Sequence, residues 1–189
     1  MKAPLRYDFA SFSKEAQAVC PNRVFTDFLH RYAYGVDASC YSYVPQVVVK
    51  ANSEEEVIRI LKLANQYGTP VTFRAAGTSL SGQASSENVL VVANDGFKNM
   101  EVLDGGKALC CDCGVIGSDA NDKLAPYGRK IGPDPATIAS ALVGGIFNNN
   151  YSGMCCGTVE NSYQTVKSVR VVLVDGTILD TSDTGSVQA

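Results

Sequence analysis

The stretch that decides how this chain folds is Arg74-Ala75-Ala76-Gly77-Thr78-Ser79-Leu80-Ser81-Gly82-Gln83. It follows residues 70–73, an apolar run that is typical of a β-strand. Its two glycines and its small side chains allow backbone N–H groups to approach a phosphate closely, because no bulky group stands in the way. The stretch therefore predicts a site for a nucleotide-type ligand, and the alternative is an ordinary tight glycine turn.

The loop matches neither of the two common phosphate-binding patterns. The chain contains no Gly-x-x-x-x-Gly-Lys-Ser/Thr sequence and no Gly-x-Gly-x-x-Gly sequence. A nucleotide site in this chain must therefore belong to a different architecture.

The residues before the loop predict a parallel strand–helix–strand unit. Residues 47–50 form a valine-rich strand, and Ser53 and Glu56 form a capping box at the start of a helix. Gly68 suits the left-handed position that ends this helix. Because strands joined by such a helix are parallel, the loop opens at the carboxyl end of the second strand, where α/β sheets bind ligands.

The remaining residues predict a different, mainly antiparallel part. We expect a third strand over residues 88–93, helices over 116–124 and 137–143, and hairpins that turn at Gly105-Gly106 and Asp175-Gly176. Residues 1–43 predict an irregular, tyrosine-rich segment with a short helix near residues 24–34. The predicted fold class is α+β, with an N-terminal segment (1–43), a small parallel βαβ lobe (44–96) and a mainly antiparallel lobe with helices (97–189).

Composition limits the partners and the compartment. The net charge is −3 without a long basic run, which argues against a nucleic-acid partner. Residues 1–19 contain no signal peptide and the seven cysteines are an odd number, so we expect a reducing, cytoplasmic location. The longest apolar stretch, residues 138–147, is too short and too rich in glycine for a transmembrane segment, which leaves peripheral association with the inner face of a membrane open.

Few side chains in the sequence suit metal binding or acid–base catalysis. His30 is the only histidine, and we expect it on the surface or packed against neighbours. Cys110, Cys111 and Cys113 share a predicted strand, and Cys155-Cys156 lie in a predicted loop. We expect plain buried thiols at these positions, and we predict neither a metal site nor a catalytic residue within the chain.

Two further clusters are rich in prolines, glycines and asparagines. In Gly132-Pro133-Asp134-Pro135-Ala136-Thr137 the prolines stiffen the backbone, and Asp134 or Thr137 is placed to cap the helix that follows. In Gly144-Gly145-Ile146-Phe147-Asn148-Asn149-Asn150-Tyr151-Ser152-Gly153, continuing to Gly157-Thr158, amides and N–H groups suit an irregular loop that grips a polar ligand. Each cluster is also compatible with an ordinary rigid turn or loop.

Taken in order, the three clusters resemble the flavin-binding half of the FAD-linked oxidases of the vanillyl-alcohol oxidase type, whose FAD domain has the PCMH-type fold. The chain is similar to the D-lactate dehydrogenases and the flavoprotein subunit of glycolate oxidase. The family pattern Pro-Val-x-x-Arg-Gly-x-Gly-Thr-Ser-Leu-x-Gly corresponds to residues 70–82, and Val-Val-Leu-x-Asp-Gly corresponds to residues 171–176. Residues 34–41 resemble the segment that leads into this domain, so the resemblance covers residues 34–181.

The resemblance implies that FAD binds between two α+β lobes, and without a covalent bond because no histidine lies near these loops. N–H groups of residues 75–79 would hold the pyrophosphate, while residues 133–137 and 144–157 would line the flavin and its ribityl chain. The cofactor-binding residues implied in this way are Arg74, Ala75, Ala76, Gly77, Thr78, Ser79, Gly82, Gln83, Pro133, Asp134, Ala136, Thr137, Gly144, Gly145, Asn148, Asn149, Ser152, Gly153 and Gly157.

The implied function is oxidation of a small D-2-hydroxy acid, of the D-lactate or glycolate type, by hydride transfer to FAD. The alternatives are the FAD domain of a cell-wall-precursor reductase or of another FAD-linked oxidase, and a non-enzymatic binding module. Members of the family continue past the position of Ala189 with a substrate domain and, in some, with an iron–sulfur domain. Substrate contacts, catalytic residues and any iron–sulfur cluster are therefore expected outside this chain, and we expect the chain alone to be inactive.

Two positions depart from the family pattern. Ala75 stands where the family has glycine, and a left-handed backbone there would cost alanine about 1 kcal/mol or more. Cys155-Cys156 stand where many members have Arg-Tyr. The second departure matches a subset of the family, and the resemblance leaves the local contacts there open.

Overall fold

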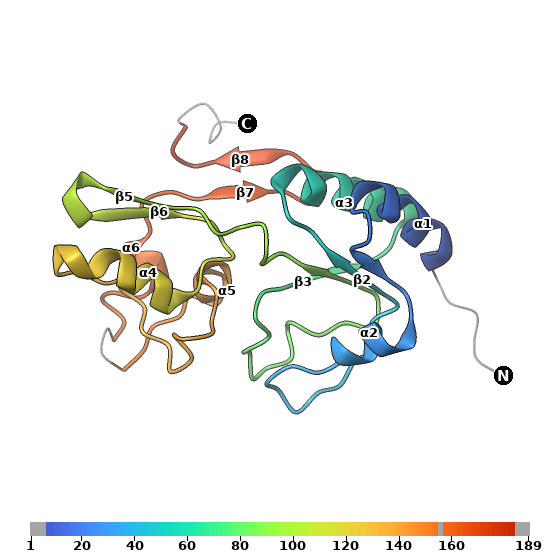
Figure 1. The fold of residues 1–189 in the computed structure, drawn as a ribbon, viewed down its shortest axis with the longest axis horizontal. Helices are drawn as coiled ribbons and strands as arrows, with labels where there is room; N and C mark the ends of the chain where they lie inside the picture. Colours follow the sequence, from blue (N-terminus) through green and yellow to red (C-terminus); the bar gives the residue numbers. More distant parts are fainter. Residues whose placement is uncertain (1–6, 155–156, 184–189) are drawn as a thin grey trace.

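The computed structural model describes residues 7–154 and 157–183 (Figure 1). At one end of the molecule a sheet is covered by helices, and at the other end a hairpin lies beside short helices. The chain crosses from the first end to the second and returns with its last hairpin.

The first end contains a four-stranded sheet. Its strands are β1 (Val24–Phe25), β2 (Val47–Lys50), β3 (Val71–Arg74) and β4 (Val89–Val92), in the order β1-β2-β4-β3. Both β2 and β3 pair in parallel with β4, so the predicted parallel unit and the predicted third strand are confirmed. Every residue of β4 is buried, as expected for an inner strand of a parallel sheet.

Helix α3 (Glu54–Tyr67) links β2 to β3 and covers one face of the sheet (Figure 1). Ser53 Oγ accepts a hydrogen bond from Glu56 N at 3.2 Å, which confirms the predicted N-terminal cap. Gly68 ends the helix with a φ of 62°. The buried residues of α3, which are Val57, Ile60, Leu61 and Ala64, pack into the main hydrophobic core with the strands.

The prediction of an irregular segment over residues 1–43 is wrong for helix α1 (Phe9–Val19). Asp8 caps this helix by accepting a hydrogen bond from Ser11 N at 3.0 Å. Phe9, Phe12 and Ala16 recur at helical spacing, and packing beside α3 buries them in the main core. The short helix predicted near residues 24–34 is α2 (Phe28–Ala33), which follows β1 and has no buried side chain.

At the other end, β5 (Met100–Leu103) and β6 (Ala108–Cys111) form the first predicted hairpin. The turn is longer than the predicted two-residue turn, because Leu103 pairs with Ala108 and a 3-10 turn lies between them. Helix α4 (Gly117–Leu124) follows, which confirms the helix predicted over residues 116–124, and a 3-10 turn over Ala125–Tyr127 ends at Gly128.

The predicted helix over residues 137–143 is wrong. Residues 136–140 form turns, in which Ala141 N donates to Thr137 O at 2.7 Å. Leu142 is extended and bridges Ile116, so helix α5 (Val143–Asn148) begins only after it. Asp134 and Thr137 therefore cap no helix, and part of the cluster predicted to be an irregular loop is helical. Helix α6 (Ser162–Thr165) follows.

The last hairpin lies along α3 (Figure 1). Its strands β7 (Arg170–Val172) and β8 (Ile178–Asp180) pair antiparallel, which confirms the second predicted hairpin, although Val172 pairs with Ile178 and the turn is again longer than two residues. Asn65 Nδ2 of α3 donates to Val174 O at 2.7 Å, and Val172 packs against the main core. The hairpin thus attaches the end of the described chain to the first sheet and its helices.

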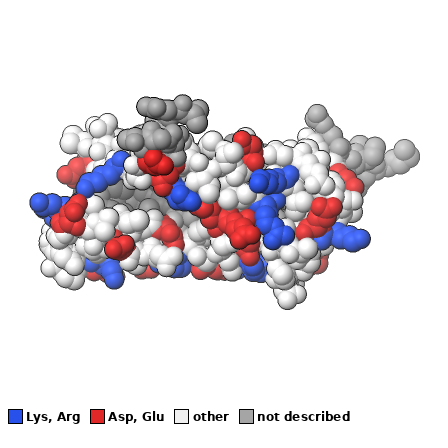
Figure 2. Space-filling model, turned by 90° about the horizontal axis from the view of Figure 1, so that it is seen from above, with Lys and Arg blue, Asp and Glu red and all other residues white. Residues whose placement is uncertain are grey.

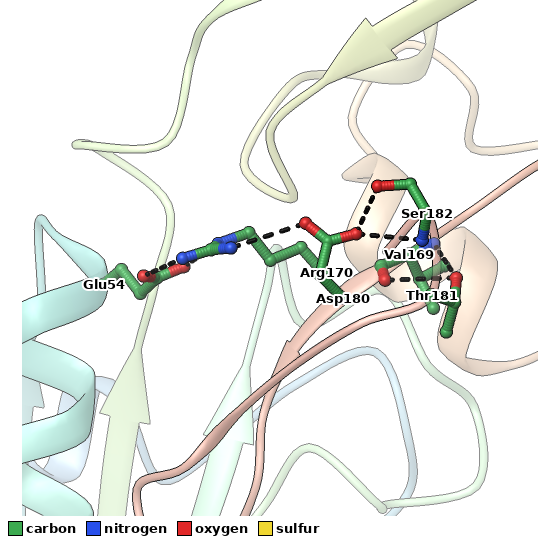
Figure 3. Close-up of polar contacts among 6 residues, drawn as sticks. All are labelled: Glu54, Val169, Arg170, Asp180, Thr181 and Ser182. Atoms are coloured by element: carbon green, nitrogen blue, oxygen red, sulfur yellow. Dashed lines mark hydrogen bonds and ion pairs between the residues drawn. The ribbon is translucent and has the colours of Figure 1, made fainter. Parts of the chain in front are cut away.

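An ion-pair cluster completes this attachment (Figure 3). Arg170 Nε and Nη2 donate to the two carboxylate oxygens of Glu54 at 2.8 and 3.0 Å. Arg170 Nη1 lies 3.4 Å from Asp180 Oδ2, so one guanidinium joins α3 to both strands of the hairpin. The face that carries α1, α3 and this hairpin shows positive and negative side chains interspersed, without a broad basic area (Figure 2).

Membrane-spanning character is absent from the helices of the described ranges. None of them has the length and apolar content that crossing a bilayer requires.

Candidate functional site

The loop over residues 74–83 is held from behind by residues 34–43. Ala38 N donates to Gly77 O at 2.9 Å. Gly77 and Gly82 have φ values of 72° and 77°, the left-handed region that favours glycine. A Cβ at Gly82 would lie 2.5 Å from the ring of Tyr41, so this contact also requires glycine. The predicted glycine loop is therefore a fixed structure with a specific support.

Asp37 anchors the far end of this support. Its carboxylate accepts hydrogen bonds from Ser39 N at 2.8 Å and from Ser85 Oγ at 3.1 Å. Burial alone would raise the pKa of Asp37, but the hydrogen bonds from Ser39 and Ser85 and the charge of Arg74 outweigh burial and lower the pKa. An ionised Asp37 thus ties the leading segment to the residues that follow the loop.

The N–H groups at the start of the loop are candidates for holding a ligand. None of the N–H groups of residues 75–79 donates a hydrogen bond to another described residue. Consecutive N–H groups without partners, in a loop shaped by positive-φ glycines, form the kind of concavity that binds a phosphate. This observation fits a diphosphate ligand at the predicted position.

Ala75 fits the loop without the predicted strain. The non-glycine residues with positive φ in the described ranges are Asn22, Asp104 and Asn150, so Ala75 has no left-handed backbone and the expected cost does not arise. Instead, a Cβ added to Gly145 would lie 3.4 Å from Ala75 Cβ. The first and third clusters therefore approach each other here.

A chain of polar side chains also joins these two clusters. Ser79 Oγ donates to Gln83 Oε1 at 2.5 Å, and Gln83 Nε2 donates to Asn149 Oδ1 at 2.9 Å. Asn149 is the C-cap residue of α5. Residues from the two predicted lobes are thus brought together at one site, although they are far apart in the sequence.

The second and third clusters pair with each other through their backbones. Asp134 N donates to Ser152 O at 2.8 Å, and Asp134 forms a parallel bridge with Gly153. Gly153 has a φ of 133°, and a Cβ there would lie 2.2 Å from Asp134 O. Pro133, the residue before this pairing, is buried.

Gly144 is required where α5 begins. Its N–H donates to Cys113 O at 2.9 Å, and a Cβ there would lie 2.6 Å from Cys113 Cβ. The glycines of the third cluster therefore permit close approach of α5 to the end of β6, a packing role that the sequence alone does not indicate.

The predicted cofactor-binding residues differ in their exposure. Gly77 and Pro133 are buried. Those partly buried are Arg74, Ala75, Thr78, Ser79, Gly82, Asp134, Gly144, Gly145, Ser152 and Gly153. Those exposed are Ala76, Gln83, Ala136, Thr137, Asn148, Asn149 and Gly157. The predicted departure at residues 155–156 lies outside the described residues.

The exposure of the cysteines differs in part from the prediction of buried thiols. Cys20 is buried, and burial raises the pKa of its thiol to about 11. Cys40, Cys110 and Cys113 are free and exposed, so the expectation of buried thiols is wrong for Cys110 and Cys113. For Cys110 the reason is that β5 and β6 form a sheet of only two strands, which leaves residues of the hairpin uncovered. Cys113 lies in the turn after β6. The described residues contain no group of three side chains able to hold a metal ion.

His30 is a surface residue, as expected. Its ring stacks on Phe25 with a centroid separation of 4.3 Å, and its Nδ1 lies 2.8 Å from Asp27 Oδ2. The histidine therefore packs at the start of α2 in contact with β1.

Comparison with known protein families identifies the family to which this chain belongs. A family model described as an FAD binding domain matches residues 45–182. The chain belongs to this family. All the predicted cofactor-binding residues lie inside the match, whereas the leading segment that supports the loop precedes it.

Curated relatives of this FAD-binding domain include oxidoreductases of hydroxy acids. The chain is 29% identical over 168 residues to the D-2-hydroxyglutarate dehydrogenase of Haemophilus influenzae, which covers 87% of the chain and 16% of that protein. It is 35% identical over 138 residues to the D-lactate dehydrogenase of Archaeoglobus fulgidus, which covers 71% of the chain and 30% of that protein. It is 28% identical to the glycolate oxidase subunit GlcD of Bacillus subtilis, which covers 80% of the chain and 33% of that protein. The FAD-binding domain thus spans a third or less of the length of these relatives.

Solved structures establish the fold class. Alkyldihydroxyacetonephosphate synthase superposes with a TM-score of 0.77 at 20% identity, covering 100% of this chain and 39% of that one. p-Cresol methylhydroxylase superposes with a TM-score of 0.75 at 16% identity, covering 92% of this chain and 35% of that one. The predicted PCMH-type FAD-binding fold of the α+β class is therefore confirmed.

Proposed function

We propose that this chain is the FAD-binding part of an oxidoreductase that oxidises a small D-2-hydroxy acid. The observation that carries the proposal is the loop after β3, where the N–H groups of residues 75–79 have no partner among the described residues. The named activities of the relatives, which are D-2-hydroxyglutarate dehydrogenase, D-lactate dehydrogenase and a glycolate oxidase subunit, support the substrate class.

Different residues of the site are proposed to hold different parts of FAD. We propose that the N–H groups of residues 75–79 hold the FAD pyrophosphate, and that residues 133–137 and 144–157 line the flavin and its ribityl chain. When bound, the flavin supplies the acceptor for a hydride from the substrate. The role of this chain is to hold the cofactor in one orientation, with Gln83 and Asn149 joining the two sides of the site at 2.9 Å.

Three further details are proposed: where the catalytic residues lie, how FAD is held and where the protein is located. The substrate contacts and the catalytic residues are proposed to lie in regions that the relatives have and this chain does not include, because the chain covers only 16% to 33% of their length. FAD is proposed to bind without a covalent bond, since the sole histidine is engaged with Phe25 and Asp27. A cytoplasmic location is proposed from the odd number of cysteines and from the lack of an apolar signal segment in residues 1–19.

The test uses the full-length gene product. We expect the purified protein to show flavin absorbance near 450 nm, either as isolated or after FAD is added. Anaerobic addition of D-lactate, glycolate or D-2-hydroxyglutarate should bleach this band, and the L-enantiomers of the chiral acids serve as controls. A protein that takes up no flavin would refute the proposal and favour a binding module. Retained flavin that no hydroxy acid bleaches would favour the reductase or another FAD-linked oxidase.

A further inference from the structure

The side chain of Arg74 lies behind the loop that it begins. Its Nη1 donates to Tyr34 O at 3.0 Å, and its guanidinium carbon lies 5.7 Å from the centre of the Tyr34 ring. A Cβ built on Gly77 would lie 2.4 Å from Nη2. The guanidinium therefore occupies the space beneath Gly77 and contacts the leading segment on its other side.

The charge of this guanidinium is not neutralised by an ion pair. No carboxylate of the described ranges lies within ion-pair distance of Arg74, whereas Arg23 pairs with Glu56 at 2.5 Å and Arg170 pairs with Glu54 at 2.8 Å. Asp37 feels the charge, but its oxygens are already bonded to Ser39 and Ser85. A permanently protonated group thus stands behind N–H groups that have no partner among the described residues.

We propose that Arg74 is a positioning residue that makes the loop selective for a diphosphate. Its guanidinium fixes Gly77 against Tyr34 and adds a full positive charge to the partial charges of the N–H groups. A half-buried, unpaired cation attracts an anion more strongly than an exposed one, because less water screens it. The inference rests on the proposed function, since FAD carries a diphosphate and riboflavin carries none.

Two variants separate charge from packing. Arg74→Gln keeps a donor for Tyr34 O and removes the charge, whereas Arg74→Lys keeps the charge and removes the planar fork. Arg31→Gln is the matched control, because Arg31 Nε also donates to a backbone carbonyl, Pro45 O, at 2.5 Å. The dissociation constants of FAD and riboflavin are measured by flavin fluorescence on the full-length gene product, at low and high salt.

We expect Arg74→Gln to lower the ratio of FAD affinity to riboflavin affinity by about tenfold and to weaken the salt dependence of FAD binding, because the N–H groups of the loop lose the positive charge behind them. Arg74→Lys should leave the salt dependence of FAD binding unchanged. Arg31→Gln should leave the ratio of FAD affinity to riboflavin affinity unchanged. An unchanged ratio in Arg74→Gln would overturn the inference and leave the FAD assignment intact. A wild-type protein that binds no FAD would instead refute the proposed function.

Discussion

At the scale of single residues, Gly82 meets two requirements at once. Its φ is 77°, and a Cβ would lie 2.5 Å from the Tyr41 ring. We expect Gly82→Ala to lower the free energy of unfolding by about 1–3 kcal/mol, because alanine pays for the left-handed backbone and also displaces Tyr41. FAD affinity should fall together with stability, since the same displacement moves the loop. Urea denaturation and FAD titration measure the two effects.

Gly105→Ala is the matched control for this change. Gly105 has a φ of 63°, and a Cβ there would have no atom within 4 Å. It lies in the turn between β5 and β6, away from the loop in sequence. We expect a loss of stability of about 1 kcal/mol from the backbone alone and unchanged FAD affinity. Equal losses of FAD affinity in the two variants would show that Gly82 has no special place in the site.

The bond between Gln83 and Asn149 allows a second test at this scale. Both side chains are exposed, so the bond contributes little to the stability of the free protein. We expect Gln83→Ala and Asn149→Ala each to weaken FAD binding, and the double variant to weaken it by less than the sum of the two. Each single change already removes the shared bond, so a double-mutant cycle on the FAD dissociation constant reports the coupling. Strict additivity would mean that the two residues contact FAD independently.

At the scale of elements, Glu56 joins the start of α3 to the strand before it. Its carboxylate accepts hydrogen bonds from Arg23 Nη1 at 2.7 Å and from Asn52 N at 2.7 Å. The hydrogen bonds from Arg23 are the main cause that lowers the pKa of Glu56, and they outweigh the opposing effect of burial. Ionised Glu56 therefore stabilises the folded state above its ordinary pKa, and this stability is lost as the pH falls through the lower folded pKa.

Glu56→Gln should reveal this dependence on pH. We expect the variant to unfold with a free energy lower by about 1–3 kcal/mol at neutral pH, because Arg23 loses its charged partner. The difference from wild type should shrink in acid, where the wild-type carboxylate is protonated as well. Glu55→Gln changes the exposed neighbour in the same turn and should have little effect at either pH. A difference that does not vary with pH would contradict the assignment of the charge.

Sequence patterns predicted the strands better than the short helices, for a physical reason. The valine runs of β2 and β4 suit a buried parallel sheet wherever they occur. Helix α1 depends on packing beside α3, which is distant in the sequence, so local sequence patterns alone do not establish it. In α5, two glycines lower the intrinsic propensity, and the contact of Gly144 with Cys113 overrides it.

In the candidate site, too, local sequence patterns were predictable and tertiary contacts were not. The glycines of the loop over residues 74–83 predicted its turns, because glycine tolerates the positive φ values found at Gly77 and Gly82. The inward position of Arg74 and the contact of Tyr41 with Gly82 were not predicted, because they depend on where tertiary structure places residues 34–43. Glycine patterns can thus be recognised in a sequence, whereas the residues that support such a loop depend on the tertiary structure.

At the scale of the whole molecule, the β7–β8 hairpin is the connection that returns from the far end to α3. Arg170 joins Glu54 of α3 to Asp180 of the hairpin, and the bonding groups are partly exposed (Figure 3). The hairpin follows the third cluster in the chain, so its attachment restrains one side of the site relative to the other. We expect Arg170→Gln to speed amide hydrogen exchange in residues 170–180 at low salt, while exchange in β2 and β4 stays unchanged. The difference should narrow at high salt, because exposed ion pairs are screened.

Lys167→Gln distinguishes this attachment from a general effect of charge near the hairpin. Lys167 lies 3.5 Å from Asp104, and this pair links the segment before β7 to the β5–β6 turn instead of to α3. We expect the control to leave exchange in the hairpin unchanged at both salt concentrations. If Arg170→Gln behaves like the control, the bond from Asn65 to Val174 O and the burial of Val172 hold the hairpin without help from the ion pairs. If exchange in the hairpin is faster in Arg170→Gln than in the control, the ion pairs of Arg170 hold the β7–β8 hairpin against α3. FAD affinity should then also fall in Arg170→Gln, because the hairpin no longer restrains the two sides of the site relative to each other.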